Sequence, residues 1–224
     1  MVAAASPLAG STVVVTAGGT REPIDPVRYL GNRSSGRMGN EIALAAAGRG
    51  ADVVLITTMA PATHERIRAV AVDTAAEMHD AVRSALDGAA VLVMAAAVAD
   101  YRPAAAAPRK LKKRESLTLD LVPTVDILAS LAHDPITNGV LMVGFAAETD
   151  DLPANAVRKL ADKRLDLIVL NDVSRTDIGM GTKDNEVTIF DSSGVAAEIS
   201  IRSKAAVASA ILDVVESRLR SVRR

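Results

Sequence analysis

Cysteine and tryptophan are absent from this 224-residue chain, and histidine occurs only three times. Without cysteine the chain has no disulfide, no thiolate metal ligand and no Cys nucleophile, which fits a reducing, cytoplasmic compartment. His64, His79 and His133 are far apart in the sequence, so we expect neither a histidine metal site nor a Ser-His-Asp triad. Aromatic residues make up 2% of the chain, which leaves few stacking platforms for single-stranded nucleic acid.

An excess of charge of one sign is also missing. The 26 basic and 27 acidic residues give a formal net charge of -1, so binding to nucleic acid or to a membrane surface is not expected, and any anion site must be local. No apolar run reaches the roughly 18 residues of a membrane span. Residues 1–10 lack the basic region of a signal peptide.

A hydrophobic fraction of 49% is enough for a substantial core. Along the chain, apolar runs typical of strands alternate with the apolar spacing typical of helices. The pattern predicts buried strands at 12–16, 52–57, 67–72, 91–95, 140–145 and 165–170. It predicts helices at 35–48, 73–86, 125–131, 152–163 and 204–219. This alternation predicts an α/β fold, a Rossmann-like, mostly parallel sheet flanked by helices. Residues 186–190 and 198–202 predict a hairpin that extends the sheet edge with antiparallel strands.

The rest of the chain is predicted from its turn-forming and polar residues. We expect a flexible N-terminus over 1–11, a single domain over 12–220 and a frayed tail over 221–224. Residues 20–26 hold two prolines and two acids, which predicts a loop without regular structure, and 117–122 predict a further strand. No internal repeat and no interdomain linker is visible.

The stretch 28–39, RYLGNRSSGRMG, combines glycines, hydroxyls and arginines ahead of a predicted helix. Ser34, Ser35 and Gly36 lie at the expected helix start, where unpaired N–H groups and the helix dipole favour a phosphate or carboxylate. The arginines add donors suited to bidentate anion binding. An ordinary serine-capped helix with solvated arginines is the alternative interpretation.

Small or polar residues follow three predicted strands, at 95–101, at 146–149 and from Asn171 onward. The carboxyl edge of an open α/β sheet is where such folds bind ligands. Lys159 and Lys163 are four residues apart, so they share one helix face, and an anion between them is one interpretation. Exposed lysines without a role are the other.

Residues 102–115 combine prolines, alanines and a basic cluster, which is typical of a mobile lid rather than of a core element. A solvated basic loop is the alternative, and a nuclear-targeting signal is a weaker one. The chain has neither a Walker loop nor a dinucleotide fingerprint after the first strand. The residues by themselves therefore indicate a phosphate-handling α/β enzyme that works by positioning and charge stabilisation.

Two blocks, AGGTREPIDPVR at 17–28 and NRSSGRMG at 32–39, resemble the signature of bacterial phosphopantothenate–cysteine ligases. This family forms the second half of the bifunctional coenzyme A biosynthesis protein. The likeness continues in the same order in AAAVADY at 95–101, KLKK at 110–113, GFAAET at 144–149 and NDV at 171–173. It covers about residues 12–217.

The resemblance implies a reaction in two steps. The carboxylate of 4'-phosphopantothenate attacks the α-phosphate of CTP and releases pyrophosphate, and the amine of L-cysteine then opens the acyl-cytidylate. It implies that Asn32 and Arg28 support the second step and that Lys110, on the lid, stabilises charge. Asp100 is implied as a nucleotide ligand and as the carboxylate beside Mg²⁺.

Taken together with the helix start and the strand ends, the candidate substrate-binding and nucleotide-binding residues are Gly18, Gly19, Ser34, Ser35, Gly36, Met94, Ala95, Ala96, Asp100, Lys112, Lys113, Val125, Asp126, Ile127, Leu128, Phe145, Lys159, Lys163 and Asn171. The resemblance also implies a homodimer and CTP rather than ATP. Residues 125–127 depart from the Asn-Pro-Asp-Ile of many relatives. The flavin-dependent decarboxylase that usually precedes this module is not in the sequence, so no flavin is expected, and a fused or associated decarboxylase is an expected partner.

Two other functions remain open on the sequence. An NAD(P)-dependent reductase would use the same kind of sheet, but the chain lacks a Tyr-x-x-x-Lys pair and the glycine fingerprint. A non-catalytic nucleotide sensor would use the same pocket without turnover.

Overall fold

The structure is a computed structural model that describes residues 5–113, 115–148, 152–172 and 184–222. Parts of the expected flexible N-terminus (1–4) and frayed tail (223–224) lie outside the described residues, as do Arg114 of the basic cluster, Thr149 and Val173. None of the helices in the described part of the chain combines the length and the apolar character that a bilayer span requires.

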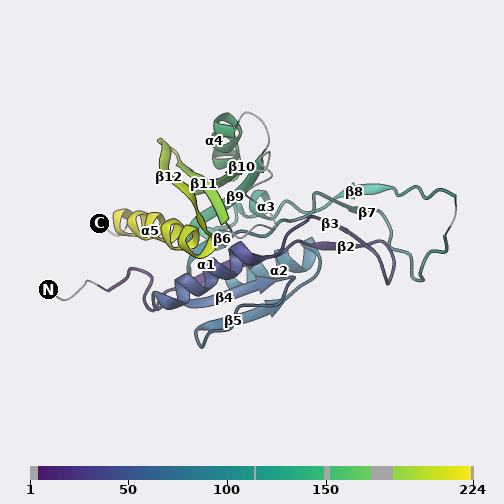
Figure 1. Cartoon of the computed structure of the whole chain (residues 1–224), viewed down its shortest axis with the longest axis horizontal. Coiled ribbons are helices and arrows are strands. Elements are labelled where there is room, and N and C mark those ends of the chain that lie inside the picture. The colour runs from purple at the N-terminus through teal and green to yellow at the C-terminus, as the bar shows by residue number, and fades with distance from the viewer. Residues whose placement is uncertain (1–4, 114, 149–151, 173–183, 223–224) are drawn as a thin grey trace.

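An eight-stranded sheet forms the centre of the molecule, in the order β12-β11-β10-β9-β6-β1-β4-β5 (Figure 1). All neighbours from β10 to β5 are parallel, and β11 and β12 are antiparallel. The predicted mostly parallel sheet with an antiparallel extension at one edge is confirmed. The strands are β1 (Thr12–Ala17), β4 (Asp52–Thr57), β5 (Ile67–Ala71), β6 (Ala89–Met94), β9 (Leu141–Glu148), β10 (Leu167–Asp172), β11 (Asp184–Asp191) and β12 (Gly194–Ser203).

Helices cover both faces of this sheet. α1 (Arg37–Gly48) and α5 (Lys204–Val222) pack on one face, and α2 (Ala75–Ala85), α3 (Ile127–Leu131) and α4 (Leu152–Asp162) pack on the other. A short 3-10 turn, η1 (Pro135–Thr137), follows α3. Because successive strand residues point to opposite faces, Val13 and Val15 join the first core and Val14 joins the second. Strands buried on both faces explain why the sequence reads as continuous apolar runs.

Two short hairpin-like pairs extend away from this body and form an arm (Figure 1). We use "arm" for residues 20–31 together with 100–124. In it β2 (Arg21–Pro23) pairs with β3 (Tyr29–Gly31), and β7 (Tyr101–Pro103) pairs with β8 (Leu121–Pro123), both antiparallel. The Ala107 amide donates to the Ile24 carbonyl at 2.9 Å and so connects the two pairs.

Two predictions for the residues of the arm are wrong. Residues 20–26 were expected to be irregular, but β2 lies within them, because its partner β3 is only a few residues further along the chain. The strand predicted at 117–122 is reduced to β8, because β7 offers only three residues for pairing. Neither face of β8 packs on the hydrophobic core, so burial does not extend the strand beyond these three residues.

Two boundaries inside the body also differ from the prediction. Helix α1 begins at Arg37 rather than at residue 35, and its N-cap is Gly36, in the left-handed region at φ 69° with no side-chain cap. The strand expected at 165–170 begins at Leu167, because the Leu165 amide still bonds to the Leu160 carbonyl of α4 at 2.9 Å.

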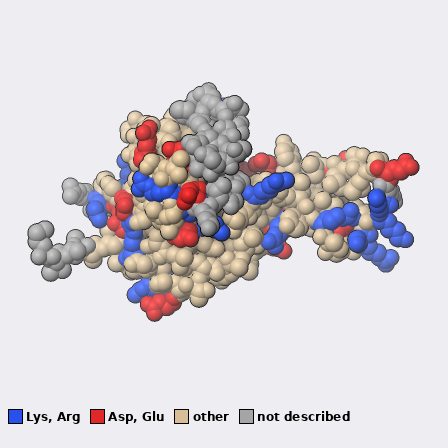
Figure 2. All heavy atoms as spheres, viewed as in Figure 1, with Lys and Arg blue, Asp and Glu red and all other residues tan. Residues whose placement is uncertain are grey.

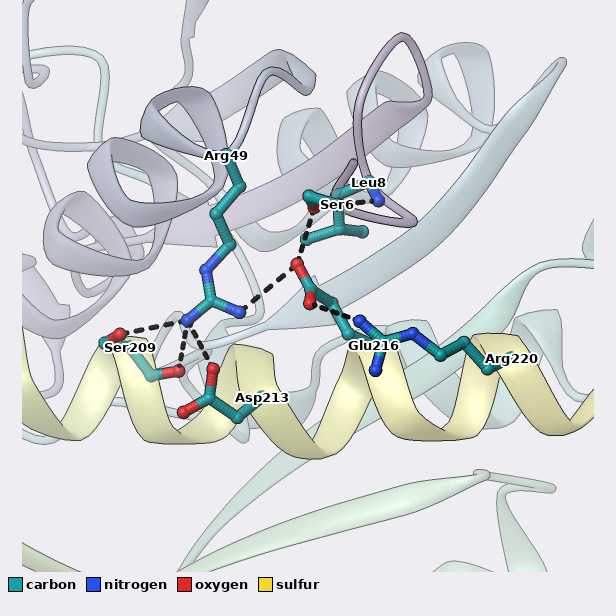
Figure 3. Close-up of polar contacts among 7 residues, drawn as sticks. All are labelled: Ser6, Leu8, Arg49, Ser209, Asp213, Glu216 and Arg220. Carbon is teal, nitrogen blue, oxygen red and sulfur yellow. Dashed lines mark hydrogen bonds and ion pairs between the residues drawn. The ribbon is translucent and has the colours of Figure 1, made fainter. Parts of the chain in front are cut away.

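The described part of the N-terminal segment, 5–11, makes specific contacts (Figure 3). Leu8 is fully buried in the core under α1 and α5. The Ser6 hydroxyl donates to Glu216 Oε1 at 2.6 Å, and Arg49 Nη1 lies 3.3 Å from the same oxygen. Arg49 Nη2 also bonds to Asp213 Oδ1 at 2.7 Å. These contacts join the start of the chain, the end of α1 and the middle of α5.

We predict that Leu8→Ala lowers the free energy of unfolding by about 2–5 kcal/mol, because it leaves a cavity where the side chain is enclosed. Val195→Ala is the control, since Val195 is 56% exposed on β12, away from the arm, and it should stay within about 0.5 kcal/mol of the parent. Urea denaturation of the three proteins measures the difference. Equal stability of the two variants would show that residues 5–11 do not support the core.

Candidate functional site

One pocket of about 520 Å³ lies at the carboxyl ends of the central strands. Its lining comes from the start of α1, the segment after β6, the start of α3, the ends of β9 and β10, α4 and the starts of β11 and α5. This is the edge at which open α/β sheets bind ligands. A cavity of this volume is in the range of small-molecule sites.

The floor of the pocket is the small-residue segment 95–100, held from both sides. On one side the Ala96 amide donates to Thr16 Oγ1 at 3.1 Å and the Ala99 amide to Thr20 Oγ1 at 2.9 Å. On the other side the Thr124 amide donates to the Asp100 carbonyl at 2.9 Å. The backbone of the floor is therefore fixed while its methyl side chains leave room for a ligand.

The first turn of α1 forms one wall, and its close approach to β1 depends on glycine. A Cβ on Gly39 would lie 2.6 Å from the Thr16 carbonyl oxygen, and one on Gly36 would lie 3.2 Å from the Gly18 amide nitrogen. Because Gly36 caps the helix without a side-chain acceptor, the first N–H groups of α1 face the pocket region without a serine cap. Such a helix start favours a bound anion. The alternative interpretation, an ordinary serine-capped helix, is wrong. Ser34, Ser35 and Gly36 lie at the start of α1 and line the pocket, where an anion is expected.

The opposite wall carries two lysines and one carboxylate. Lys159 and Lys163 both line the pocket, as their spacing predicts, and Lys163 Nζ lies 2.9 Å from Asp126 Oδ2. Partial burial works against the charge of Asp126, but the hydrogen bond from Lys163, the Ala129 amide and the charge of Lys159 outweigh it and lower the pKa of this carboxyl. Asp126 is thus ionised at neutral pH and also caps α3, accepting from the Ala129 amide at 3.1 Å.

Asn32 lies beside the floor rather than in the lining. Its Nδ2 donates to the Val98 carbonyl at 2.9 Å, and Val98 itself lines the pocket. A Cβ on Gly19 would lie 2.6 Å from the Asn32 carbonyl oxygen. Gly19 therefore acts by allowing the Asn32 loop to lie against the turn after β1.

Arg28 is held by an enclosed carboxylate, Asp25, which the sequence reasoning missed. Asp25 Oδ2 accepts from Arg28 Nε at 2.9 Å and from the Leu111 amide at 3.1 Å, and Oδ1 accepts from the amides of Val27 and Arg28 at 2.8 and 2.9 Å. Arg28 Nη2 also donates to the Leu111 carbonyl at 2.8 Å. The Asp-Pro-Val-Arg order is an Asx-turn signal that could have identified this contact. Asp25 thereby joins Arg28 to Leu111, the residue next to Lys110.

Fifteen of the predicted site residues line the pocket: Ser34, Ser35, Gly36, Met94, Ala95, Ala96, Asp100, Val125, Asp126, Ile127, Leu128, Phe145, Lys159, Lys163 and Asn171. The others do not: Gly18, Gly19, Arg28, Asn32, Lys110, Lys112 and Lys113. The three lysines lie between β7 and β8, and Figure 2 shows basic side chains gathered on the arm, away from the body. The arm extends outward, so in this conformation it does not cover the pocket.

Arg37, one of the arginines expected to bind an anion, also lines the pocket. Three polar residues of the lining were not predicted: Thr124, Asn185 and Lys204. The last two are at the starts of β11 and α5, more than 140 residues beyond the 28–39 stretch, and no local pattern connects them to it. A lysine at a helix start is electrostatically unfavourable, and this was the one signal in the sequence that could have indicated Lys204.

A divalent cation would have one carboxylate available beside the floor. Nowhere in the described residues do three or more His, Cys, Asp or Glu side chains gather in a way that would hold a metal ion. Asp100 lines the pocket, and Mg²⁺ is commonly held by one or two carboxylates together with substrate phosphates. The donor set fits a metal that arrives with a nucleotide.

Comparison with known proteins agrees with this architecture. Residues 8–219 match the family model described as DNA/pantothenate metabolism flavoprotein C-terminal domain. The chain belongs to this family. The resemblance to the ligase half of the bifunctional coenzyme A biosynthesis protein is thereby confirmed.

The relatives of this chain include proteins named coenzyme A biosynthesis bifunctional protein CoaBC. The one from Bacillus subtilis is 44% identical over 212 residues, covering 92% of this chain and 51% of the relative, and the one from Vibrio vulnificus is 41% identical over 215 residues, covering 94% and 53%. The chain spans about half the length of the curated relatives it matches.

Two solved structures share the fold of this chain. The crystal structure of the C-terminal domain of CoaBC has a TM-score of 0.79 and 35% identity, covering 96% of this chain and 98% of that one. A Cab2 H337A mutant in complex with phosphopantothenate-cysteine has a TM-score of 0.77 at 17% identity, covering 94% and 87%, and shows the same fold.

We predict that Asp25→Asn destabilises the protein at neutral pH, because the amide cannot replace a carboxylate that accepts from several donors. The hydrogen bonds of Arg28, followed by those of the Leu111 and Val27 amides, hold the pKa of Asp25 well below its usual range. A depressed pKa stabilises the fold above the unfolded value of about 3.9 and loses this effect as the pH falls further.

Urea midpoints of the parent and Asp25→Asn, measured from pH 7 down to the most acid pH at which the parent folds, test this. The gap between the two proteins should be constant down to about pH 4 and should narrow below it. Asp73→Asn is the control, since Asp73 pairs with Arg21 in the open, with its side chain 65% exposed. A gap that widens in acid would contradict the assigned role of Asp25.

Proposed function

We propose that the chain catalyses the CTP-dependent ligation of L-cysteine to 4'-phosphopantothenate through a 4'-phosphopantothenoyl-CMP intermediate, in coenzyme A biosynthesis. The observation that carries this proposal is the pocket itself. It combines an anion-binding helix start, a floor of small residues and a wall with two lysines, in a chain whose relatives are named CoaBC.

The proposed reaction first activates a carboxylate by joining it to a phosphate, and the positive charges of the pocket favour this step. A carboxylate oxygen of phosphopantothenate forms a bond to the α-phosphorus, the bond from that phosphorus to the bridging oxygen breaks, and its electron pair leaves with pyrophosphate. Negative charge grows on the phosphates during this step, so fixed amides and cations stabilise it. The cysteine amine then attacks the carbonyl carbon, CMP leaves with the electron pair of the acyl–oxygen bond, and the proton that the nitrogen loses passes to solvent.

Residue roles follow from position. Phe145 and the Lys159–Lys163 wall would hold the base and ribose end of CTP, and Asp100 would hold Mg²⁺ together with the phosphates. Asn32, fixed on the Val98 carbonyl, would orient the acyl group for the second step, and Arg28 would support it through the Asp25 network. When bound there, Mg²⁺ would neutralise part of the negative charge on the triphosphate.

The proposal is tested by pyrophosphate release with each of the four nucleoside triphosphates, with and without phosphopantothenate and cysteine. Release should require phosphopantothenate and should be fastest with CTP, and phosphopantothenoylcysteine should form only when cysteine is added. Nucleotide binding without any pyrophosphate release would instead indicate a nucleotide sensor.

Asn32→Asp separates the two steps. The variant should still release pyrophosphate, because the role proposed for Asn32 is on the acyl group in the second step. The yield of cysteine adduct should fall by at least about tenfold, the usual scale for losing one oriented donor. Product is measured by mass spectrometry in single turnover. Asn155→Asp, on α4 outside the pocket lining, is the control. Parental adduct formation by Asn32→Asp would refute the role given to it.

We also propose that the chain forms a homodimer through the arm. Most of the strongly exposed large apolar residues lie on it: Val27, Tyr29, Tyr101, Leu117 and Leu121. Apolar groups gathered on one projecting element typically mark an interface. Light scattering should give twice the chain mass of 23.3 kDa, and Val27→Glu with Leu121→Glu should return it to the monomer value. A monomeric parent would refute the dimer.

A further inference from the structure

The starts of α1 and α5 meet at one wall of the pocket, and each presents a cation there. Arg37 is the first residue of α1, Lys204 is the first residue of α5, and both line the pocket. Neither helix has an acidic residue in its first turn. Each helix start carries about half a positive charge, so this wall collects two partial and two full positive charges.

Lys204 occupies a position that works against its own charge. Lys204 is only 5% exposed, and it lies at the N-terminal end of α5, where the helix dipole repels cations. Burial, and then the nearby charge of Arg37, lower the pKa of this ammonium group. The carboxylates of the described pocket lining, Asp100 and Asp126, lie on other elements, and Asp126 pairs with Lys163.

A second, independent observation comes from Asn185. This residue is 3% exposed and lines the same pocket, and its Oδ1 has no hydrogen-bond partner. It opposes Arg202 in the β11–β12 register, two residues before Lys204. A buried amide without a full set of partners is costly, and half a turn about its last bond presents the Nδ2 donors at the same place. In that orientation Nδ2 of Asn185 would donate to a ligand oxygen at this wall.

We propose that Lys204, with Arg37, Asn185 and the first amides of α1, binds the terminal phosphate groups of the nucleoside triphosphate, the part that leaves as pyrophosphate. This inference rests on the proposed function and adds the residues that hold the leaving group. The lysine wall of α4 lies across the pocket, on the other face of the sheet, and takes the nucleoside end. When the bond to the α-phosphorus breaks, the electron pair moves onto the pyrophosphate oxygen, and the two cations stabilise that charge.

The 4'-phosphate of phosphopantothenate has the same anion chemistry, so the experiment tests each of the two ligands separately. Inorganic pyrophosphate is titrated calorimetrically into the full chain, which requires no turnover. The parent should bind it, and Lys204→Gln should weaken binding by about tenfold or more, as expected for the loss of one charge-assisted hydrogen bond. Lys204→Arg should retain most of the affinity, and Arg68→Gln, an exposed cation on β5, should bind as the parent does.

Steady-state kinetics then assigns the source. Lys204→Gln should raise the KM for CTP and leave the KM for phosphopantothenate unchanged, and Arg37→Gln, whose side chain is exposed, should behave alike. A rise confined to the KM for phosphopantothenate would overturn the assignment, because the wall would then hold the 4'-phosphate. Unchanged pyrophosphate affinity in both variants would overturn the subsite altogether.

Folding and function are separated by two readouts. Lys204→Gln should remain folded at the assay temperature, since glutamine keeps a polar, hydrogen-bonding side chain at this position; a thermal melt checks this. A Lys204→Gln protein that does not fold leaves Arg37→Gln to decide the question. If pyrophosphate binds in a Lys204-dependent way but no CTP-dependent ligation occurs, the proposed function fails while the anion subsite stands.

Discussion

The contact between the first turn of α1 and the end of β1 is the constraint on which the site depends. At Gly39 the two backbones are so close that a single added methyl group would overlap the Thr16 carbonyl oxygen. This approach directs the start of α1 toward the ends of the neighbouring strands. It also places the turn after β1 where Thr16 and Thr20 can hold the segment that follows β6. The pocket floor and the anion-binding helix start are thus fixed by the same contact.

The charges of the pocket are arranged on two opposite walls. On the α4 side, Asp126 compensates Lys163 and leaves that wall only moderately positive. On the α1 and α5 side, cations and helix starts add to each other. A ligand with a compact nucleoside at one end and several negative charges at the other matches this distribution, and a neutral ligand does not.

The body of the fold could be predicted from the sequence because its signals are local. Apolar runs such as 12–16 and 91–95 mark strands buried on both faces, and the i, i+4 spacing of Lys159 and Lys163 places both on one helix face. The start of α1 was misplaced because serine is a better N-cap than glycine by propensity, whereas close packing on Gly18 decides the matter.

The arm and the far wall could not be predicted in the same way. Strands of three residues such as β2 and β7 carry almost no periodic signal, since pairing across the arm rather than burial stabilises them. Asn185 and Lys204 reach the pocket only through the order of strands in the sheet. Asp25 was overlooked because its partner Leu111 is 86 residues away in the chain.

The link between Ser6 and Glu216 joins groups 210 positions apart (Figure 3). The layer that contains Leu8, α1 and α5 therefore cannot be completed on the ribosome until the final helix has left the exit tunnel. Until then the side of α1 that packs on α5, and the part of the sheet face that α5 covers, stay exposed. Contacts of such long range slow folding, so this layer is where a nascent chain would most need protection from aggregation.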